Sequence, residues 1–160
     1  MRVGFGYDIH RLVENIPLFL GGVYIEYGKG LLGHSDGDVI LHAICDAILG
    51  ASGLGDLGEY FPSSDPQYKN VESKYFASKI VEVLNEKWSI VNLDATIVAE
   101  EPKLKKHIDT IRLSIADLFS LKHDQVNIKS KTNDKLGIIG SGGGIASFAI
   151  VLIEENNEAL

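Results

Sequence analysis

The alternation of apolar and polar positions predicts a β-strand at the start of the chain. Val3, Phe5 and Tyr7 are separated by two glycines and followed by Asp8, which is the two-residue period of a short strand. Residues 16–27 contain further apolar runs around a pair of adjacent glycines and predict short extended segments. The N-terminal part of the chain is therefore expected to be mostly β-structure.

Three later segments change to the spacing of an amphipathic helix. The first helix is expected to run from Asp36 to Gly50, the second to begin near Asn70, and the third to end near Ser120. Residues 51–69 carry three glycines and two prolines and predict a loop of a length that is usually functional. The apolar stripes are Val39, Ile40, Ala43, Ile44, Ala47 and Ile48 in the first helix, Tyr75, Phe76, Ile80, Val83 and Leu84 in the second, and Ile108, Ile111, Ile115, Leu118 and Phe119 in the third.

Three more strands are predicted in the second half of the chain. Residues 91–99 are apolar at most positions and predict a strand that is buried on both faces. Residues 126–131 and 145–153 predict two further strands, one after the third helix and one near the C-terminus. Helices packed on one face of a mixed sheet would make an α+β fold. With 160 residues, no internal repeat and no linker, we expect a single domain that spans residues 1–160.

Composition and charge narrow the class of protein. Hydrophobic residues make up 45% of the chain and charged residues 23%, which is typical of a globular protein with a core. The net charge of -7 argues against a general nucleic-acid binder, which needs a basic face. The single Cys45 cannot form an internal disulfide and is expected to be a buried, inert thiol. Without a targeting or membrane segment in the sequence, we predict a reducing, cytoplasmic location.

Aspartates and histidines near the N-terminus form a candidate metal site. Asp8 and His10 point to the same face of the predicted strand, a pattern that by itself is also typical of a polar strand edge. Asp38, His42 and Asp46 follow at four-residue steps on the first helix, so that carboxylates flank a histidine and could hold its second nitrogen. Asp8, His10 and His42 would supply three ligands and leave a fourth position open, as in catalytic zinc sites. A solvated polar stripe is the alternative interpretation.

Two features are candidates for binding an anion. Ser35 or Asp36 is predicted to cap the first helix, where free backbone N–H groups favour negative charge. The glycine-rich residues 140–144 lack the ending of a P-loop and the register of a dinucleotide-binding loop, so a turn between strands is the more common interpretation.

Lysines gather in two short segments. Residues 103–106 and 129–135 hold six of the twelve lysines in the chain. Lysines neutralise phosphoryl oxygens, Thr132 could donate a hydrogen bond to them, and Asp134 could hold a magnesium ion that the phosphates also bind. A surface with scattered lysines is the alternative interpretation. The spacing thus favours, without requiring, a phosphate-binding strand end.

Five motifs in order resemble one enzyme family along essentially the whole chain. They are Gly6-Tyr7-Asp8-Ile9-His10, His34-Ser35-Asp36-Gly37-Asp38 running to His42, Gly55-Asp56-Leu57-Gly58 with Phe61-Pro62, Glu101-Pro102-Lys103, and Lys135-Leu136-Gly137. The family is that of the 2-C-methyl-D-erythritol 2,4-cyclodiphosphate synthases. The stretch from Ser35 to His42 is the most specific part of the resemblance.

The resemblance implies a fold, an assembly and a reaction. The fold would be an α+β two-layer sandwich, a variant of the ferredoxin-like arrangement, assembled as a homotrimer with active sites between subunits. The enzyme would be a lyase of the non-mevalonate isoprenoid pathway that acts on a small molecule, with no nucleic-acid or membrane partner. The 2-phosphate of 4-diphosphocytidyl-2-C-methyl-D-erythritol 2-phosphate would attack the β-phosphorus and release CMP. Because attacking and leaving groups belong to one molecule, no protein nucleophile is required.

The resemblance also implies roles for individual residues. Asp8, His10 and His42 would bind zinc, and Asp134 would hold Mg²⁺ or Mn²⁺ together with the substrate diphosphate. His34 and Thr132 would be catalytic residues that stabilise the transition state. Substrate contacts would come from two groups of residues. The first is Asp8, Ile9, His10, His34, Ser35, Asp56, Leu57, Gly58, Phe61, Pro62, Ser63, Ser64 and Asp65, and the second is Ala99, Glu100, Glu101, Pro102, Lys103, Leu104, Lys105, Lys131, Thr132, Asn133, Asp134, Ile138 and Ser141.

The sequence departs from the family pattern at three positions. Ser141 and Gly143 stand where many members carry arginine and glutamate, which puts in doubt the binding of an isoprenoid diphosphate in a central cavity. Lys131 stands where threonine is frequent, and we hypothesise that it contributes to diphosphate binding. Two other functions stay open at this stage. One is a zinc-dependent phosphohydrolase or phosphodiesterase, which needs an activated water, and the other is a non-catalytic protein that binds cytidine nucleotides or isoprenoid diphosphates.

Overall fold

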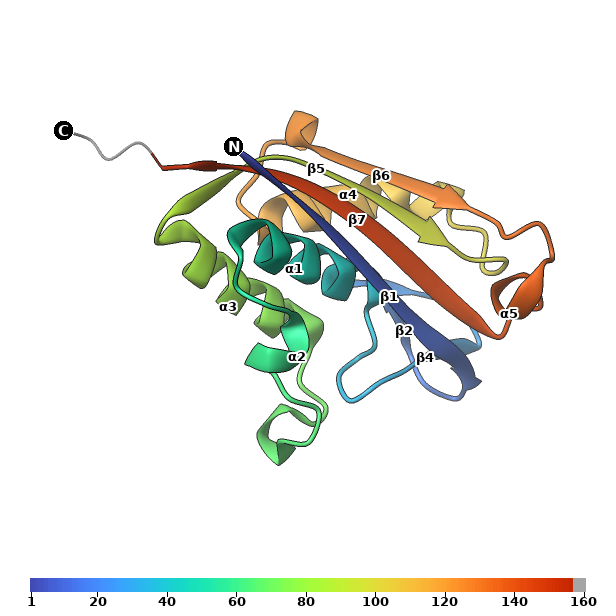
Figure 1. Cartoon of the computed structure of the whole chain (residues 1–160). Coiled ribbons are helices and arrows are strands. Elements are labelled where there is room, and N and C mark those ends of the chain that lie inside the picture. Colours follow the sequence, from blue (N-terminus) through green and yellow to red (C-terminus); the bar gives the residue numbers. More distant parts are fainter. Residues whose placement is uncertain (157–160) are drawn as a thin grey trace.

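A five-stranded mixed sheet is the frame of the computed structural model, which describes residues 1–156 (Figure 1). The strand order is β4-β1-β7-β5-β6, and β5 and β6 are parallel while all other neighbours are antiparallel. The strands are β1 (Arg2–Glu14), β4 (Lys29–Leu32), β5 (Trp88–Val98), β6 (Val126–Lys131) and β7 (Gly144–Glu155), and β2 (Leu18–Leu20) pairs with β3 (Val23–Ile25) in a separate hairpin. The predicted mixed sheet is confirmed.

Three helices pack on one face of this sheet, which confirms the predicted α+β fold (Figure 1). They are α1 (Val39–Ser52), α3 (Ser73–Asn85) and α4 (Ile108–Leu118). Shorter helical turns lie in the connections: α2 (Leu57–Tyr60), η1 (Pro66–Tyr68), η2 (Lys105–His107), η3 (His123–Gln125) and α5 (Gly137–Gly140). Within residues 1–156, none of the helices has the length and apolar character needed to cross a membrane.

Glycines allow β1 and α1 to approach each other very closely. A Cβ atom added at Gly4 would lie 1.8 Å from the carbonyl oxygen of Ala47, and one at Gly6 would lie 1.9 Å from that of Ala43. Only a residue without a side chain fits between a strand and a helix backbone at this distance. The glycine row therefore faces α1, and Asp8 continues the same row because side chains alternate along a strand.

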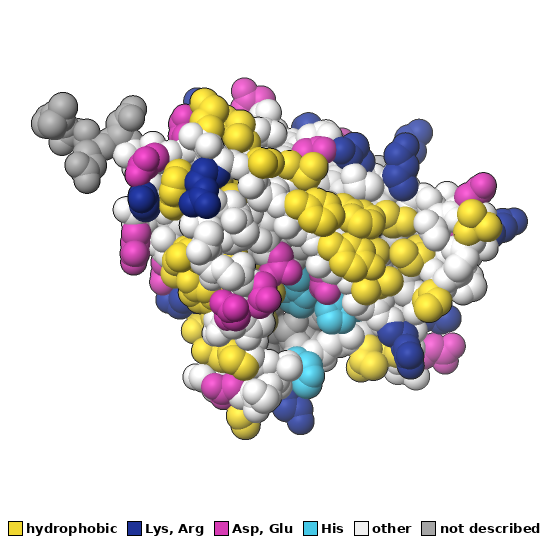
Figure 2. Space-filling model, in the orientation of Figure 1, with side chains coloured by type: hydrophobic (Ala, Val, Ile, Leu, Met, Phe, Trp, Pro, Cys, Tyr) yellow, Lys and Arg dark blue, Asp and Glu magenta, His cyan; other side chains and the backbone are white. Residues whose placement is uncertain are grey.

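The opposite face of the sheet carries exposed apolar side chains. Val3, Phe5 and Tyr7 are 68%, 62% and 45% exposed, and Phe148 of β7 packs against Tyr7 with ring centroids 5.0 Å apart. Figure 2 shows these hydrophobic side chains gathered over β1 and β7. We call Val3, Phe5, Tyr7, Phe148 and Ile150 the apolar sheet face. Val3, Phe5 and Tyr7 thus point away from the helices, and the core side of this part of the strand is made of Gly4 and Gly6.

Two predicted strands differ from the observed ones. The predicted short N-terminal strand is 13 residues long, because its pairing with β7 and then β4 continues past the histidine motif. The prediction that residues 91–99 are buried on both faces was wrong. Leu93, Ala95 and Ile97 are buried, whereas Asn92 is exposed and Thr96 only half-buried. The helices cover one face of β5, and the other face belongs to the open side of the sheet.

The helix boundaries shift by a few residues. α1 continues past Gly50 and ends at Gly53, whose φ of 74° is the left-handed conformation typical of helix ends. The second helix begins at Ser73 rather than near Asn70 and leaves Tyr75 exposed. The third helix and the mostly irregular segment 51–69 agree with the predictions. Cys45 is buried in α1, and burial raises the pKa of its thiol, which agrees with the predicted inert cysteine.

Candidate metal centre and active site

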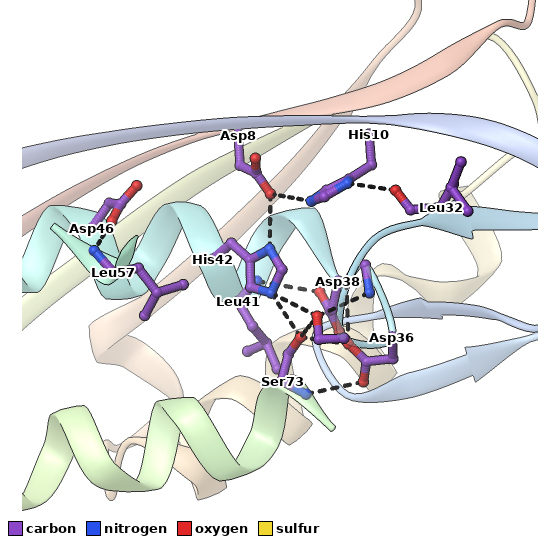
Figure 3. A network of polar contacts seen from close by, with 12 residues as sticks. Asp8, His10, Leu32, Asp36, Asp38, Leu41, His42, Asp46, Leu57 and Ser73 are labelled. Carbon is purple, nitrogen blue, oxygen red and sulfur yellow. Dashed lines mark hydrogen bonds and ion pairs between the residues drawn. The ribbon is translucent and has the colours of Figure 1, made fainter. Parts of the chain in front are cut away.

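Asp8, His10 and His42 converge as the sequence spacing predicted (Figure 3). Asp8 and His10 project from β1 toward α1, which carries His42. The Asp8 Oδ2 atom lies 3.0 Å from His10 Nε2 and 2.9 Å from His42 Nδ1. One ligand atom from each of the three residues lies within 4.8 Å of the other two, so the group has the geometry of a metal site.

The outer nitrogen of His10 is fixed by the backbone. Its Nδ1 atom lies 2.7 Å from the carbonyl oxygen of Leu32 in β4. A carbonyl oxygen only accepts, so Nδ1 carries a proton and donates it, and Nε2 is the ring nitrogen that faces Asp8. Backbone acceptors of this kind orient histidine ligands in metalloproteins.

The site concentrates negative charge that a cation can neutralise. Burial raises the pKa of Asp8, but hydrogen bonds from His10 and His42 outweigh burial and leave this pKa well below its ordinary value. The hydrogen bond to Asp8 raises the pKa of His10 against the opposing effect of burial. A carboxylate that favours ionisation beside two imidazole nitrogens is a donor set that suits zinc. The residues present therefore fit a bound divalent cation.

Asp38 has a structural role that differs from the predicted one. It is completely buried and caps α1, and its carboxylate accepts N–H groups from Gly21 at 2.9 Å, Gly22 at 2.6 Å and Leu41 at 3.2 Å. Burial raises the pKa of Asp38, and these N–H groups oppose that effect. The prediction that Ser35 or Asp36 caps the first helix was wrong, because Asp38 is the N-cap residue of α1 and accepts the N–H of Leu41.

The second nitrogen of His42 is held by hydroxyl groups rather than by the flanking aspartates. His42 Nε2 lies 2.8 Å from Ser73 Oγ (Figure 3). Asp46, one turn further along α1, instead accepts the backbone N–H of Leu57 at 2.8 Å. Burial raises the pKa of Asp46, and the Leu57 bond opposes it. Both contacts cross between segments far apart in sequence, so helical spacing gave no signal for either of them.

A cavity of about 470 Å³ opens beside the metal group, and we call it the histidine pocket. Its lining residues are Asp8, His10, His34, Ser35, His42, Asp46, Leu57, Gly58, Phe61, Pro62, Ser63, Ser64, Asp65, Tyr68 and Phe76. Figure 2 shows this hollow with histidines and acidic side chains at its rim. The structure thus brings most of the first predicted group into one cavity.

Two residues of that group lie elsewhere. Ile9 is exposed and points to the opposite face of β1 from Asp8. Asp56 caps α2 by accepting the N–H of Glu59 at 3.0 Å and does not line the cavity.

Tyr68 and Phe76 complete the apolar wall of the histidine pocket and were not among the predicted site residues. Phe61 packs against Phe76 of α3 with ring centroids 4.6 Å apart, and Tyr68 meets Phe61 edge-on at 5.2 Å. Phe76 was predicted only as part of an apolar helix stripe. No local motif marks an aromatic residue of one helix as the wall of a site that is completed by a distant loop.

Residues of the second predicted group gather where β5 and β6 end, and we call this region the lysine edge. A cavity of about 120 Å³ is lined there by Ala99, Pro102, Lys103, Leu104, Lys105, Ser130, Lys131 and Thr132. The N–H of Lys135 donates to Glu100 Oε2 at 3.3 Å, which links the segments after β5 and after β6.

The remaining residues of the second group lie outside that cavity. Asp134 is exposed in the turn that follows β6, with a φ of 51°. Glu101 and Asn133 do not line the cavity. Ile138 and Ser141 belong to the connection before β7, where Ser141 Oγ donates to the Ile138 carbonyl at 3.0 Å.

The histidine pocket and the lysine edge lie at different strands of the sheet and share no lining residue. The histidine pocket is built on β1, and the lysine edge on the ends of β5 and β6. Two strands, β7 and β5, separate β1 from β6, which corresponds to about 14 Å at ordinary strand spacing. Within one chain, His34 therefore does not face Thr132.

Comparisons with known proteins agree with this architecture. The model of the YgbB family matches residues 1–154. A curated 2-C-methyl-D-erythritol 2,4-cyclodiphosphate synthase from Clostridium perfringens is 52% identical over 154 residues, which cover 96% of this chain and 99% of the relative.

Solved structures are similar along nearly the whole chain. A 2C-methyl-D-erythritol-2,4-cyclodiphosphate synthase in a CDP-bound form superposes with a TM-score of 0.88 at 33% identity and covers 96% of this chain and 100% of its own. The CDP complex of IspF from Plasmodium falciparum gives a TM-score of 0.85 at 35% identity and covers 98% of this chain and 97% of its own.

Proposed function

Because the chain belongs to the YgbB family, we propose that it converts 4-diphosphocytidyl-2-C-methyl-D-erythritol 2-phosphate into 2-C-methyl-D-erythritol 2,4-cyclodiphosphate and CMP. An oxygen of the 2-phosphate forms a bond to the β-phosphorus, and the bond from that phosphorus to the α–β bridging oxygen breaks. CMP leaves with the bridging oxygen, so atoms and charges balance without water. The enzyme is a phosphorus–oxygen lyase of the non-mevalonate isoprenoid pathway.

The observation that carries this proposal is the convergence of Asp8, His10 and His42 beside the histidine pocket. One carboxylate and two imidazoles with a free fourth position are the ligands of a catalytic zinc ion. When bound there, zinc supplies Lewis-acid neutralisation of phosphoryl oxygens. The chain's own contribution is to orient the three ligands through β1, α1 and the Leu32 carbonyl.

The histidine pocket is the proposed site of the methylerythritol phosphate. His34 and Ser35 line the same cavity as the metal ligands, which supports contacts from both residues to the phosphate that attacks. The backbone carbonyl of His34 accepts the N–H of Asn70 at 2.7 Å, which holds its loop near the start of α3. Phe61 and the following residues to Asp65 cover the carbon skeleton from the other side.

The lysine edge is the proposed site of the cytidine and the diphosphate. The CDP-bound relatives support a cytidine diphosphate-linked substrate for this chain. Lys103 and Lys131 place positive charge near the cavity between the ends of β5 and β6, and the exposed Thr132 can donate to a phosphoryl oxygen. Asp134 is the proposed ligand of a second divalent ion, Mg²⁺ or Mn²⁺, which hard oxygen donors prefer.

A complete active site requires both regions, and this favours a homotrimer. Two strands separate the two regions within one sheet. A cyclic assembly can place the histidine pocket of one subunit against the lysine edge of the next. The apolar sheet face supplies a surface that such an assembly would bury. We assign residues 1–160 to one synthase domain of this trimer.

Product analysis tests the proposed reaction. Purified protein with the cytidine-linked substrate, Zn²⁺ and Mg²⁺ is expected to give equimolar CMP and a cyclic diphosphate, which phosphorus NMR distinguishes by two coupled diphosphate signals. Inorganic phosphate as product would instead assign a phosphohydrolase. Binding of CDP without turnover under the same conditions would assign a non-catalytic nucleotide-binding protein.

A further inference from the structure

Ser73 is a completely buried serine that lies directly behind a metal ligand (Figure 3). It is the first residue of α3, and its Oγ atom is 2.8 Å from His42 Nε2, on the side of the ring that faces away from Asp8. The same Oγ atom makes a short hydrogen bond to Asp36 Oδ1. Ser73 is therefore inserted between a carboxylate and an imidazole.

Counting protons determines the direction of these bonds. A serine hydroxyl has one proton, and an ionised carboxylate only accepts. The proton of Ser73 thus goes to Asp36, and Ser73 Oγ must accept from His42. Nε2 of His42 then carries a ring proton, and Nδ1 faces Asp8 Oδ2 at 2.9 Å, on the side where an ion would bind.

Asp36 holds Ser73 by two atoms. Its Oδ2 atom accepts the backbone N–H of Ser73 at 3.1 Å, in addition to the hydroxyl bond to Oδ1. The cap position of α3, Glu72, makes no side-chain capping bond, so Asp36 satisfies a helix N–H that would otherwise lack a partner. The carboxylate therefore fixes both the position of α3 and the orientation of the Ser73 hydroxyl.

Ser35 is the other hydroxyl near this nitrogen and is less constrained. Its Oγ atom is 3.2 Å from His42 Nε2 and 3.3 Å from Ser73 Oγ, and it accepts the N–H of Gly37 at 3.2 Å. Ser35 forms no side-chain bond to a carboxylate among the described contacts. The shorter, charge-anchored contact from Ser73 is the one that can define the tautomer.

We infer that Ser73 is a positioning residue for metal binding, because the chain Asp36–Ser73–His42 holds His42 in its Nε2–H tautomer and aims Nδ1 at the ion. This inference rests on the proposed metal-binding role of Asp8, His10 and His42. Partners of the second ring nitrogen raise ligand basicity, and their removal costs about 10- to 100-fold in metal affinity. α3, which also carries Phe76 of the pocket wall, thereby connects the wall to the metal centre.

Metal affinity without substrate tests the inference. Zn²⁺ titrations against a competing chelator are expected to show about 10- to 100-fold weaker binding for Ser73→Ala than for the wild type. Ser52→Ala is the matched control, because Ser52 is a buried helical serine whose hydroxyl donates to the Ile48 carbonyl, and its affinity is expected to stay at the wild-type value. Ser35→Ala is expected to weaken binding less than Ser73→Ala. Equal affinities for Ser73→Ala and Ser52→Ala would overturn the inference.

A measurement on the wild type avoids the risk that Ser73→Ala fails to fold. In metal-free protein at alkaline pH, nitrogen NMR is expected to place the His42 ring proton on Nε2. A proton on Nδ1 would overturn the inference whatever the variants show.

The same titrations separate this inference from the proposed metal centre. If the wild type binds Zn²⁺ and His42→Ala does not, the centre stands, and the comparison of Ser73→Ala with Ser52→Ala then decides the role of Ser73 alone. If His42→Ala binds as tightly as the wild type, the proposed centre itself fails, and the inference about Ser73 fails with it.

Discussion

The histidine pocket and the lysine edge differ in how far the chain itself orders them. Asp8, His10 and His42 are half-buried. Asp8 Oδ2 contacts both histidines, the Leu32 carbonyl holds His10 Nδ1, and Ser73 Oγ holds His42 Nε2. At the lysine edge, Lys131 and Asp134 are exposed and make no side-chain bond among the described contacts. A site for a small ion must be rigid before the ion arrives, whereas a surface for a large flexible ligand can be ordered by the ligand and by a neighbouring subunit.

The distribution of charge follows the same division. The chain has a net charge of -7, yet six of its twelve lysines lie in residues 103–106 and 129–135. The proposed function assigns acidic groups at the histidine pocket, such as Asp8, to a cation and the lysines to phosphates. Global charge is therefore a poor guide to a ligand, because a local cluster of lysines can oppose the net charge of the chain.

Removing a ligand of the rigid site is expected to have the largest effect. His42→Ala should abolish tight Zn²⁺ binding and lower kcat by about 100- to 1000-fold, because a preorganised electrostatic group is lost. Steady-state kinetics and metal analysis of the purified variant check both effects. His123→Ala, which removes an exposed histidine outside the described cavities, should leave both values unchanged. Full activity of His42→Ala would contradict the assignment of the metal centre to the histidine pocket.

Mixed assemblies test whether the two regions act from different subunits. His42→Ala and Asp134→Asn should each be nearly inactive, since they disable opposite regions. When both variants are co-expressed with different tags and the trimers that carry both tags are purified, about a third of wild-type activity is expected, because one of the three interfaces in each mixed trimer combines two intact regions. An active site contained in a single chain predicts no recovery.

Close packing of β1 against α1 should set the stability of the histidine pocket. Gly6→Ala places a Cβ atom against the Ala43 carbonyl and should lower the free energy of unfolding by about 1–3 kcal/mol. It should also weaken Zn²⁺ binding, because the strand that carries Asp8 must move. Denaturant unfolding in chelator and metal titration measure the two effects. Gly28→Ala is the control, since a Cβ atom there meets no atom within 4 Å, and an equal result for both variants would refute the close packing.

Local periodicity was sufficient for most of the fold. The three helices and the mixed sheet follow from apolar spacing, since each element has one dominant covered face. The first strand was more difficult, because Gly4 and Gly6 face the core at its start while Val3, Phe5 and Tyr7 are exposed. Two-sided burial of residues 91–99 was wrong because the face of β5 that the helices leave open carries Asn92, Asp94 and Thr96, which are not buried.

The metal group was predictable because Asp8 and His10 are two residues apart, and His42 stands four residues from both Asp38 and Asp46. Asp8 and His10 share a strand face, and His42 lies on a helix that packs against that strand. The groups that hold this trio were not predictable in the same way. Leu32 and Ser73 act through contacts between distant segments, and the Leu32 contact uses a backbone carbonyl that leaves no mark on residue choice. Sequence spacing therefore indicated the ligands, and only the fold showed what orients them.

The smallest expected effect is at the exposed end of the lysine edge. Lys131→Ala should raise KM about 2- to 5-fold with little change in kcat, since an exposed charge in water contributes modestly to binding a phosphate. Lys129→Ala is the matched control, because Lys129 lies two residues earlier on the same face of β6 and its ammonium is paired with Asp94. Kinetics at low and high salt should show the Lys131 effect shrinking as ionic strength rises, while the control stays flat. If KM and kcat of Lys131→Ala equal the wild-type values at low salt, Lys131 has no part in diphosphate binding, and the positive charge of this region must act through Lys103 and Lys105.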